Sequence, residues 1–350
     1  MSAPAAVLPP PAPTDGGLWA AVDALVARAP SLADVYSHRL ELFAARQLRA
    51  AGDDVPEDLL ARERRAAIAA LTAPLLLSRI REAYDGPLLL IKGPEVAARY
   101  PDPTLRLFGD VDLLTPDADA AQAALLAAGF VEIGDPELYI DIHHLRPLEL
   151  PGLPLVVEVH SRPKWVAGLP APTIEELLVD AVPTAVGAPG ILAPSPAKHA
   201  LLLAAHSWAH EPLRLLRDVV DFAAVGGDAN REQLQVLAAE WGVSRLWRST
   251  DAAARAVLYG DAQPRSLRLW AQNLGLARER TVLENHLQRW LSDFWVLSPT
   301  RALRRWPAIF KNEVLPDRGE PWRRKLSRAV LAFRNAHRRR SEHDDEAGVS

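Results

Sequence analysis

Hydrophobic residues recur at helical spacing from Leu18 to Tyr84. Apolar positions three or four residues apart form a stripe along one side of a helix, and Pro30 and Gly52 interrupt the run. About three helices are therefore expected within an N-terminal helical region, 17–84. The residues before it are rich in Pro and Ala and lack this periodicity, so 1–16 are expected to form a disordered tail.

The pattern changes after Tyr84, where short apolar runs alternate with helical segments. The predicted elements are a strand in PLLLI (87–91), a short helix over 94–100, a strand in FGDVDLLT (108–115), a helix over 117–130, and a hairpin formed by YIDIHHLRPLEL and LPLVVEVHSRP around Pro151 and Gly152. Together they indicate a small α/β core over 85–165.

Beyond Pro170 the amphipathic helical pattern returns and is predicted to continue. We expect a helical C-terminal region over 166–340, rich in Arg and Trp near its end, and a charged disordered tail over 341–350. The expected fold class is α+β, with a small mixed sheet between two helical regions.

Composition excludes several kinds of protein. The chain has no cysteine, which rules out disulfides, zinc–thiolate sites and thiol nucleophiles. A net charge of −4 argues against a protein that coats nucleic acid, although a local basic pocket remains compatible with it. No run of about 18 uncharged apolar residues predicts a membrane span, and the N-terminus is unlike a signal peptide. A cytoplasmic protein is expected.

Three carboxylates on predicted strands are the main candidates for chemistry. Asp110 and Asp112 are two residues apart, so they lie on one face of their strand, while the intervening Val111 lies on the other. Glu158 sits between two valines on a later strand. Oxygen ligands on neighbouring strands suit hard divalent cations, and such cations would offset the repulsion between like charges. The pattern predicts a metal site.

The order of these elements resembles the polymerase-beta-like nucleotidyltransferase fold. More narrowly, LLLIKGPEVAARYPDPTLRLFGDVDLL, followed by VEVHSRP and by HALLLAAHSWAH, resembles an uncharacterised bacterial nucleotidyltransferase family in which a LysGly turn replaces the more usual GlySer. The resemblance covers about residues 60–230. It departs from the usual pattern in lacking the serine hydroxyl and in the longer gap between Gly93 and Asp110.

The resemblance implies a role for each matching residue. Asp110 and Asp112 would bind two Mg²⁺ ions, with Mn²⁺ as another possibility, and Glu158 would complete the catalytic site. Lys92 and the backbone N–H at Gly93 would hold the triphosphate of a nucleoside triphosphate (NTP). Arg106 would neutralise phosphate charge, and His160 would orient the acceptor or a phosphate. The implied reaction moves a nucleoside monophosphate to a hydroxyl or phosphate and releases pyrophosphate.

Several alternatives remain open at this stage. The acceptor is unidentified: a small molecule, a peptide natural product, a protein or a tRNA end. A catalytically degenerate protein that binds a nucleotide or a partner is the main alternative, and a metal hydrolase is another. His199, His206 and His210 share one helical face, where packing is favoured over metal binding. Arg217, Asp218 and Asp221 could pair within their helix, or Arg217 could reach the nucleotide; the structural role is favoured. Nucleic-acid binding by the Arg–Trp tail is not favoured.

Overall fold

The computed structural model describes residues 17–140, 142–209, 213–264, 268, 275–316 and 321–339. The predicted disordered tails and His210 lie outside the described residues.

Four helices, instead of about three, precede the sheet. They are α1 (Leu18–Ala27), α2 (Leu32–Ser37), α3 (Glu41–Ala51) and α4 (Glu57–Ala83). Gly52 ends α3 in the left-handed conformation, as the pattern predicts. The unpredicted break separates α2 from α3, where Arg39 has a positive φ of 56° and the carbonyl of His38 accepts a hydrogen bond from Arg217 N–H. Tertiary contacts therefore interrupt a locally helical pattern.

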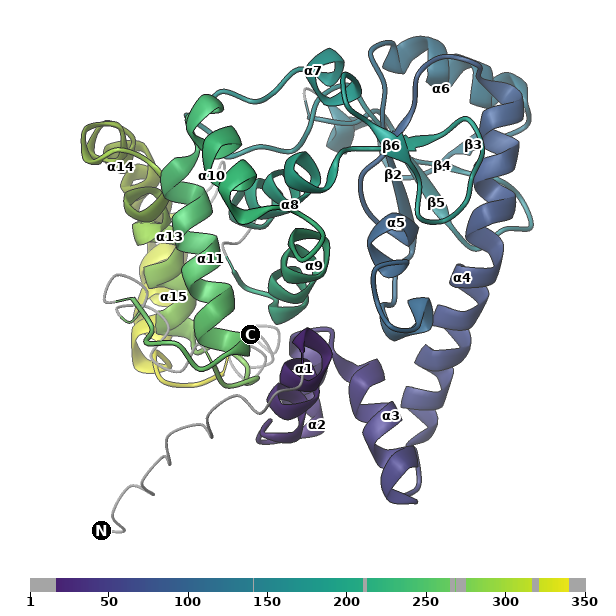
Figure 1. Ribbon diagram of the computed structural model, residues 1–350. Helices are drawn as coiled ribbons and strands as arrows, with labels where there is room; N and C mark the ends of the chain where they lie inside the picture. The colour runs from purple at the N-terminus through teal and green to yellow at the C-terminus, as the bar shows by residue number, and fades with distance from the viewer. Residues whose placement is uncertain are drawn as a thin grey trace.

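A seven-stranded mixed sheet forms the centre of the α/β core, with strand order β3-β4-β5-β2-β1-β7-β6 (Figure 1). Its strands are β1 (Leu89–Leu90), β2 (Asp110–Leu114), β3 (Val131–Glu132), β4 (Leu148–Glu149), β5 (Val156–His160), β6 (Val182–Pro183) and β7 (Leu192–Ala193). Strand β2 pairs in parallel with β5 and antiparallel with β1. The expected α+β class is confirmed.

Short helices and turns connect the strands. They are α5 (Pro94–Ala97), the 3₁₀ turns η1 (Pro103–Leu105) and η2 (Pro136–Tyr139), α6 (Ala118–Ala127) and α7 (Ile174–Leu178). Pro94 occupies the first turn of α5, and the Asp117 side chain caps α6, both as predicted. Helix α5 ends before the predicted limit at 100.

Two apolar layers hold the sheet between helices (Figure 1). On one face, Val111, Leu113, Val157 and Val159 pack in a core shared with α4 and α6. On the other face, Leu89 and Leu114 join the core that contains α8 (Pro196–Ala209) and α9 (Leu216–Gly226). The alternation along β2 therefore directs its aspartates toward the helical C-terminal region.

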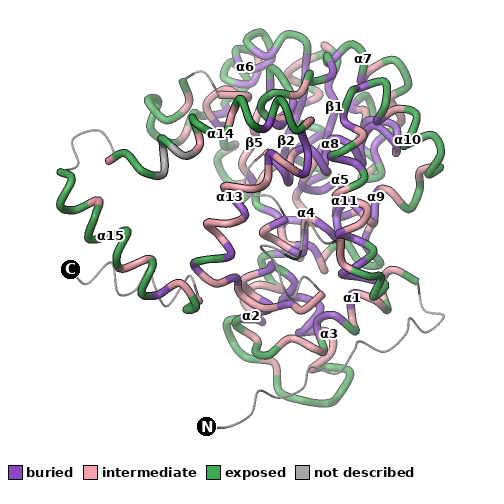
Figure 2. Tube along the Cα trace, turned by 90° about the vertical axis from the view of Figure 1, so that its left-hand side faces the viewer, coloured by how far each residue is buried: buried purple, intermediate pink, exposed green. Residues whose placement is uncertain are grey.

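The remaining described helices are α10 (Arg231–Glu240), α11 (Ser244–Leu258), α13 (Val282–Val296), α14 (Pro299–Val314) and α15 (Trp322–Arg334). Figure 2 shows α15 exposed along most of its length, away from the body of the molecule. Among the described helices, none combines the length and apolar character that a membrane span requires.

Two sequence predictions are wrong in detail. The chain is not helical throughout after Pro170, because β6 and β7 extend the sheet beyond the expected α/β core. Each has only two residues, too few to show a period of two in the sequence. The segment YIDIHHLRPLEL was expected to be a strand along its length, but only Leu148 and Glu149 form β4, paired with β5 as the predicted hairpin.

Candidate active site

The carboxylates of β2 and β5 lie on the same face of the sheet. In the parallel pairing of the two strands, Asp112 is opposite Glu158. The hydrophobic neighbours of Asp112 point into the core beneath α4 and α6, which forces the carboxylates to the opposite face. Asp110, two residues earlier, is on this face and is only partly exposed. The structure thus places the three predicted acidic residues on one face of the sheet.

The turn at Lys92 and Gly93 lies directly against the start of β2. Gly93 has a positive φ of 60°, and a Cβ at this position would overlap the backbone carbonyl oxygen of Asp110. Only glycine combines this conformation with so close an approach. The glycine therefore sets the distance between the turn and the aspartate strand.

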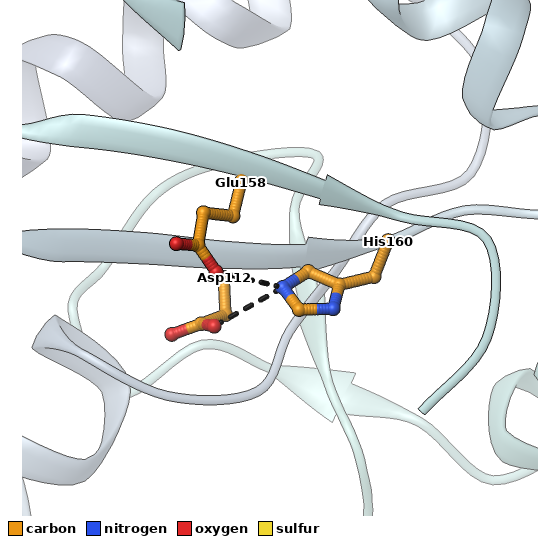
Figure 3. A group of neighbouring side chains, drawn as sticks. All are labelled: Asp112, Glu158 and His160. Atoms are coloured by element: carbon orange, nitrogen blue, oxygen red, sulfur yellow. Dashed lines mark hydrogen bonds and ion pairs between the residues drawn. The ribbon is translucent and has the colours of Figure 1, made fainter. Parts of the chain in front are cut away.

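Asp112 and Glu158, at the middle of β2 and β5, form a compact group with His160 at the end of β5 (Figure 3). His160 Nε2 lies 3.1 Å from Asp112 Oδ1 and 3.5 Å from Glu158 Oε2. Asp112 Oδ2 is buried and has no hydrogen-bond partner among the described residues. Because an unpaired buried carboxylate oxygen is costly, this atom is a candidate ligand atom.

The charges in this group depend on one another. Burial alone would raise the pKa of Asp112, but the hydrogen bond and charge of His160 outweigh it and lower that pKa. Burial would likewise lower the pKa of His160, and its hydrogen bonds to Asp112 and Glu158 raise it instead. The pKa of Asp110 is raised by burial and by the charge of Asp112. The raised pKa of His160 favours its protonated form, which would link two carboxylates that otherwise repel.

Further basic groups surround the carboxylates, and the sequence analysis missed most of them. His144 Nε2 is 3.9 Å from Glu158 Oε2, and the His143 ring is 5.2 Å from the His160 ring. Burial and the nearby imidazoles lower the pKa of His143 to about 3. Lys164 has a lowered pKa because of burial and the charge of Lys92. The adjacent histidines at 143 and 144 are the only visible signal for this cluster.

The histidines of α8 have different roles. His199 Nε2 donates a hydrogen bond to the carbonyl of Ile91 at 2.8 Å, so this residue fastens α8 to the sheet, as the packing interpretation predicts. His206 Nε2 lies 3.3 Å from Lys92 Nζ and therefore reaches the candidate site. Burial and the Lys92 charge keep the pKa of His206 well below its usual value.

Arg106 is buried beneath the turn and does not point freely into the site. Its guanidinium makes two 2.8 Å hydrogen bonds to Asp221 on α9 and a 3.3 Å hydrogen bond to the Gly93 carbonyl. Tyr100 Oη donates a third hydrogen bond to Asp221. Arg106 therefore joins the turn to α9, and the phosphate contact that the resemblance implies stays a prediction.

A cavity of about 460 Å³ opens beside Asp110. It lies between α4, the segment that joins α2 to α3, the residues that precede β2, and the start of α9. Of the described residues, six basic and two acidic side chains line it; they are Arg39, Arg62, Arg65, Lys92, Arg106 and Arg217, with Glu41 and Asp110. Lys92 and Asp110 connect this cavity to the carboxylate group.

The donor atoms fit a divalent cation. Asp112, Glu158 and His160 each offer a ligand atom, and these atoms all lie within 4.8 Å of one another. Carboxylate oxygens suit Mg²⁺ and Mn²⁺, whereas an imidazole nitrogen is more usual for Mn²⁺ and later transition metals. Asp110, although on the same face, is not part of this group of three.

A family model described as "Uncharacterised nucleotidyltransferase" matches residues 32–258. This range contains every carboxylate and basic residue of the site and ends at the last residue of α11. Comparisons with curated protein sequences and with solved structures gave no match.

Proposed function

We propose, from the premise that this chain belongs to the uncharacterised nucleotidyltransferase family, that it transfers a nucleoside monophosphate from an NTP to a hydroxyl or phosphate of an acceptor. The observation that carries the proposal is the buried, unpartnered oxygen of Asp112 beside Glu158, with Asp110 on the same sheet face. These carboxylates adjoin a basic cavity, the combination that transfer between polyanions needs.

Asp110, Asp112 and Glu158 are the proposed metal ligands, with two Mg²⁺ ions as the first expectation. Bound there, divalent cations would neutralise phosphate charge and favour the deprotonated form of the attacking oxygen. The nearness of His160 makes Mn²⁺ a second candidate.

The side chains of the protein would position the reactants. Lys92, held at the turn by Gly93, would contact the triphosphate. The acceptor oxygen would bond to the α-phosphorus as the bond to the β-phosphate breaks, and pyrophosphate would leave. Glu158 is partly exposed, at 24% of its side chain, so it can receive the acceptor proton. His160 is buried and would orient Glu158 and Asp112.

One observation favours the non-catalytic alternative. His160 already contacts Asp112 and Glu158, and its raised pKa favours a protonated form that would give the two carboxylates a counter-charge without metal. A protein in which this link were permanent would bind a nucleotide or a partner without turnover. Catalysis requires that a cation compete with His160 for Asp112.

The proposal is tested by incubating the full-length protein with each of the four NTPs, Mg²⁺ or Mn²⁺, and a cell lysate as the acceptor source. Release of pyrophosphate that is lost in the Asp110→Asn/Asp112→Asn double variant supports nucleotidyl transfer. Asp119→Asn, an exposed aspartate in the first turn of α6, is the matched control and should retain activity. Nucleotide binding without pyrophosphate release would indicate the degenerate alternative, and release of phosphate alone a hydrolase.

The proposed reaction is compatible with several classes of acceptor. A small molecule, a peptide natural product, a protein or a tRNA end each presents a hydroxyl or phosphate, and labelled material recovered from the lysate would identify which it is.

A further inference from the structure

The basic cavity beside Asp110 contains more positive charge than its surroundings neutralise. Of its six basic side chains, Arg106 is paired with Asp221, and Arg62 with Glu41 at 2.9 Å. Arg39 and Arg65 form no ion pair within 4 Å among the described residues, and Arg217 is only 3.8 Å from Asp218. Among the lining residues that the structure describes, Asp110 is the one remaining carboxylate.

Arg217 adds an independent sign that a ligand is missing. Its side chain is 10% exposed and lines the cavity, and its Nε is buried without a hydrogen-bond partner among the described residues. Its Nη1 donates only a long hydrogen bond, 3.4 Å, to the Leu107 carbonyl. A buried, unsatisfied guanidinium donor is costly unless an acceptor fills the cavity.

Arg39 lines the cavity with an unfavourable backbone angle and an unfavourable electrostatic environment. Its φ of 56° is rare for a residue with a side chain and costs of order 1 kcal/mol. Burial and the nearby positive charge of Arg217 lower its pKa. Strain and repulsion on the same residue are typical of a functional position, and an anion between the two guanidinium groups would relieve the repulsion.

From Arg39 and Arg65, unpaired among the described residues, and the unsatisfied Nε of Arg217 we infer that the cavity binds a polyphosphate chain, held by these three arginines beside Lys92. Planar guanidinium groups match phosphate oxygens through paired hydrogen bonds, and several of them around one space suit a chain of phosphates better than a single carboxylate. Arg65 belongs to α4 and Arg39 to the α2–α3 connection, so the N-terminal helices would complete the site.

This inference rests on the proposed function only for the source of the polyphosphate. The polyphosphate is either the triphosphate tail of the NTP or a phosphorylated end of the acceptor. In both cases the anion lies beside Asp110, where the reacting phosphate is needed.

Inorganic tripolyphosphate is the probe, titrated calorimetrically into the full-length protein in EDTA, so that no metal bridges it to the carboxylates. The wild type should bind it with an affinity that falls as salt rises. Arg65→Gln and Arg39→Asn should each weaken binding about tenfold, as expected for the loss of a charge-assisted contact. Asn is chosen at 39 because it tolerates a positive φ.

Arg64→Gln is the matched control, because Arg64 is exposed on the same helix and pairs with Glu57 outside the cavity. It should leave binding and transfer activity unchanged. Absence of tripolyphosphate binding by the wild type would overturn the inference, and so would equal losses in Arg64→Gln and Arg65→Gln.

Two further measurements separate this inference from the proposed function. Asp110→Asn should bind tripolyphosphate at least as tightly as the wild type, since it removes a nearby negative charge, while it abolishes nucleotidyl transfer. Loss of tripolyphosphate binding in Asp110→Asn would contradict the arginine assignment. Displacement of tripolyphosphate by an NTP identifies the triphosphate tail as the occupant of the cavity. NTP binding without displacement identifies a phosphorylated end of the acceptor as the occupant.

Discussion

Gly93 and Asp110 approach so closely that a single methyl group on Gly93 would overlap the Asp110 carbonyl oxygen. The contact joins the turn that carries Lys92 to the strand that carries the two aspartates. It makes the geometry of the site depend on a residue with no side chain.

Gly93→Ala should therefore damage both stability and activity. The positive φ of Gly93 and the overlap with Asp110 together should cost about 2 kcal/mol or more. Thermal unfolding and pyrophosphate release would measure the two effects. Gly109→Ala is the control for stability, because a Cβ there meets no atom within 4 Å and the φ of Gly109 lies outside the positive range that favours glycine. Equal stability of the two variants would contradict the close-packed turn.

Removing one partner of the buried pair of Arg106 and Asp221 should strongly lower the free energy of unfolding. Both side chains are 2% exposed, so Asp221→Ala leaves a buried guanidinium without its counter-charge, and a loss of about 3–5 kcal/mol is expected in urea unfolding. Removing Asp228 from its pair with Arg99 is the control, with an expected effect below about 1 kcal/mol, because Asp228 is 52% exposed. Similar losses in both variants would show that burial does not decide the effect.

Acid should destabilise the protein through its buried histidines. Burial lowers the pKa of both His38 and His199 from 6.5 to about 4. Because the folded pKa lies below the unfolded one, their contribution is complete above pH 6.5 and is lost as pH falls toward 4, by up to about 3 kcal/mol for each residue.

Urea unfolding between pH 7.5 and 4.5 measures this loss. His199→Gln can still donate to the Ile91 carbonyl but cannot be protonated, so its stability should fall less steeply with pH than that of the wild type. The exposed His337→Gln should follow the wild-type profile. If the stability of His199→Gln fell with pH as steeply as that of the wild type, His199 would not be a cause of the acid destabilisation.

Divalent cations should stabilise the folded protein. Asp110 and Asp112 repel each other, and Asp112 Oδ2 lacks a partner among the described residues, so a bound cation should raise the melting temperature. At 100 times its dissociation constant the gain is about 2.7 kcal/mol. Scanning calorimetry with Mg²⁺, Mn²⁺ or EDTA measures the shift. The Asp112→Asn variant should show little response; an equal response would place the cation elsewhere.

Much of the fold follows from hydrophobic periodicity. The long helix α4, the turn at Gly93 and the alternation along β2 are visible in the sequence, because each produces a sustained pattern or a glycine at a required bend. The strands β6 and β7 are too short to do so. The break at Arg39 arises from contacts with α9, which lies more than 170 residues away, and no local signal encodes it.

The site was predictable only in part. Asp110, Asp112 and Glu158 stand out because acidic residues within valine- and leucine-rich strands are unusual. Arg65 does not stand out, since an arginine on an amphipathic helix has the same pattern whether it faces solvent or a cavity; Arg39 lies at a break that the sequence does not signal, and for Arg217 the sequence favours a structural role. Their common cavity depends on how the N-terminal helices pack against the sheet, which is tertiary information.

The position of the label transferred from an NTP tests the central claim most directly. With lysate as acceptor and a divalent cation present, the account predicts that label from the α-phosphate becomes attached to the acceptor, whereas label from the γ-phosphate leaves as pyrophosphate. The Asp110→Asn/Asp112→Asn variant should transfer neither. Transfer of the γ-label, or undiminished transfer of the α-label by the double variant, would contradict the assignment of these carboxylates to nucleotidyl transfer.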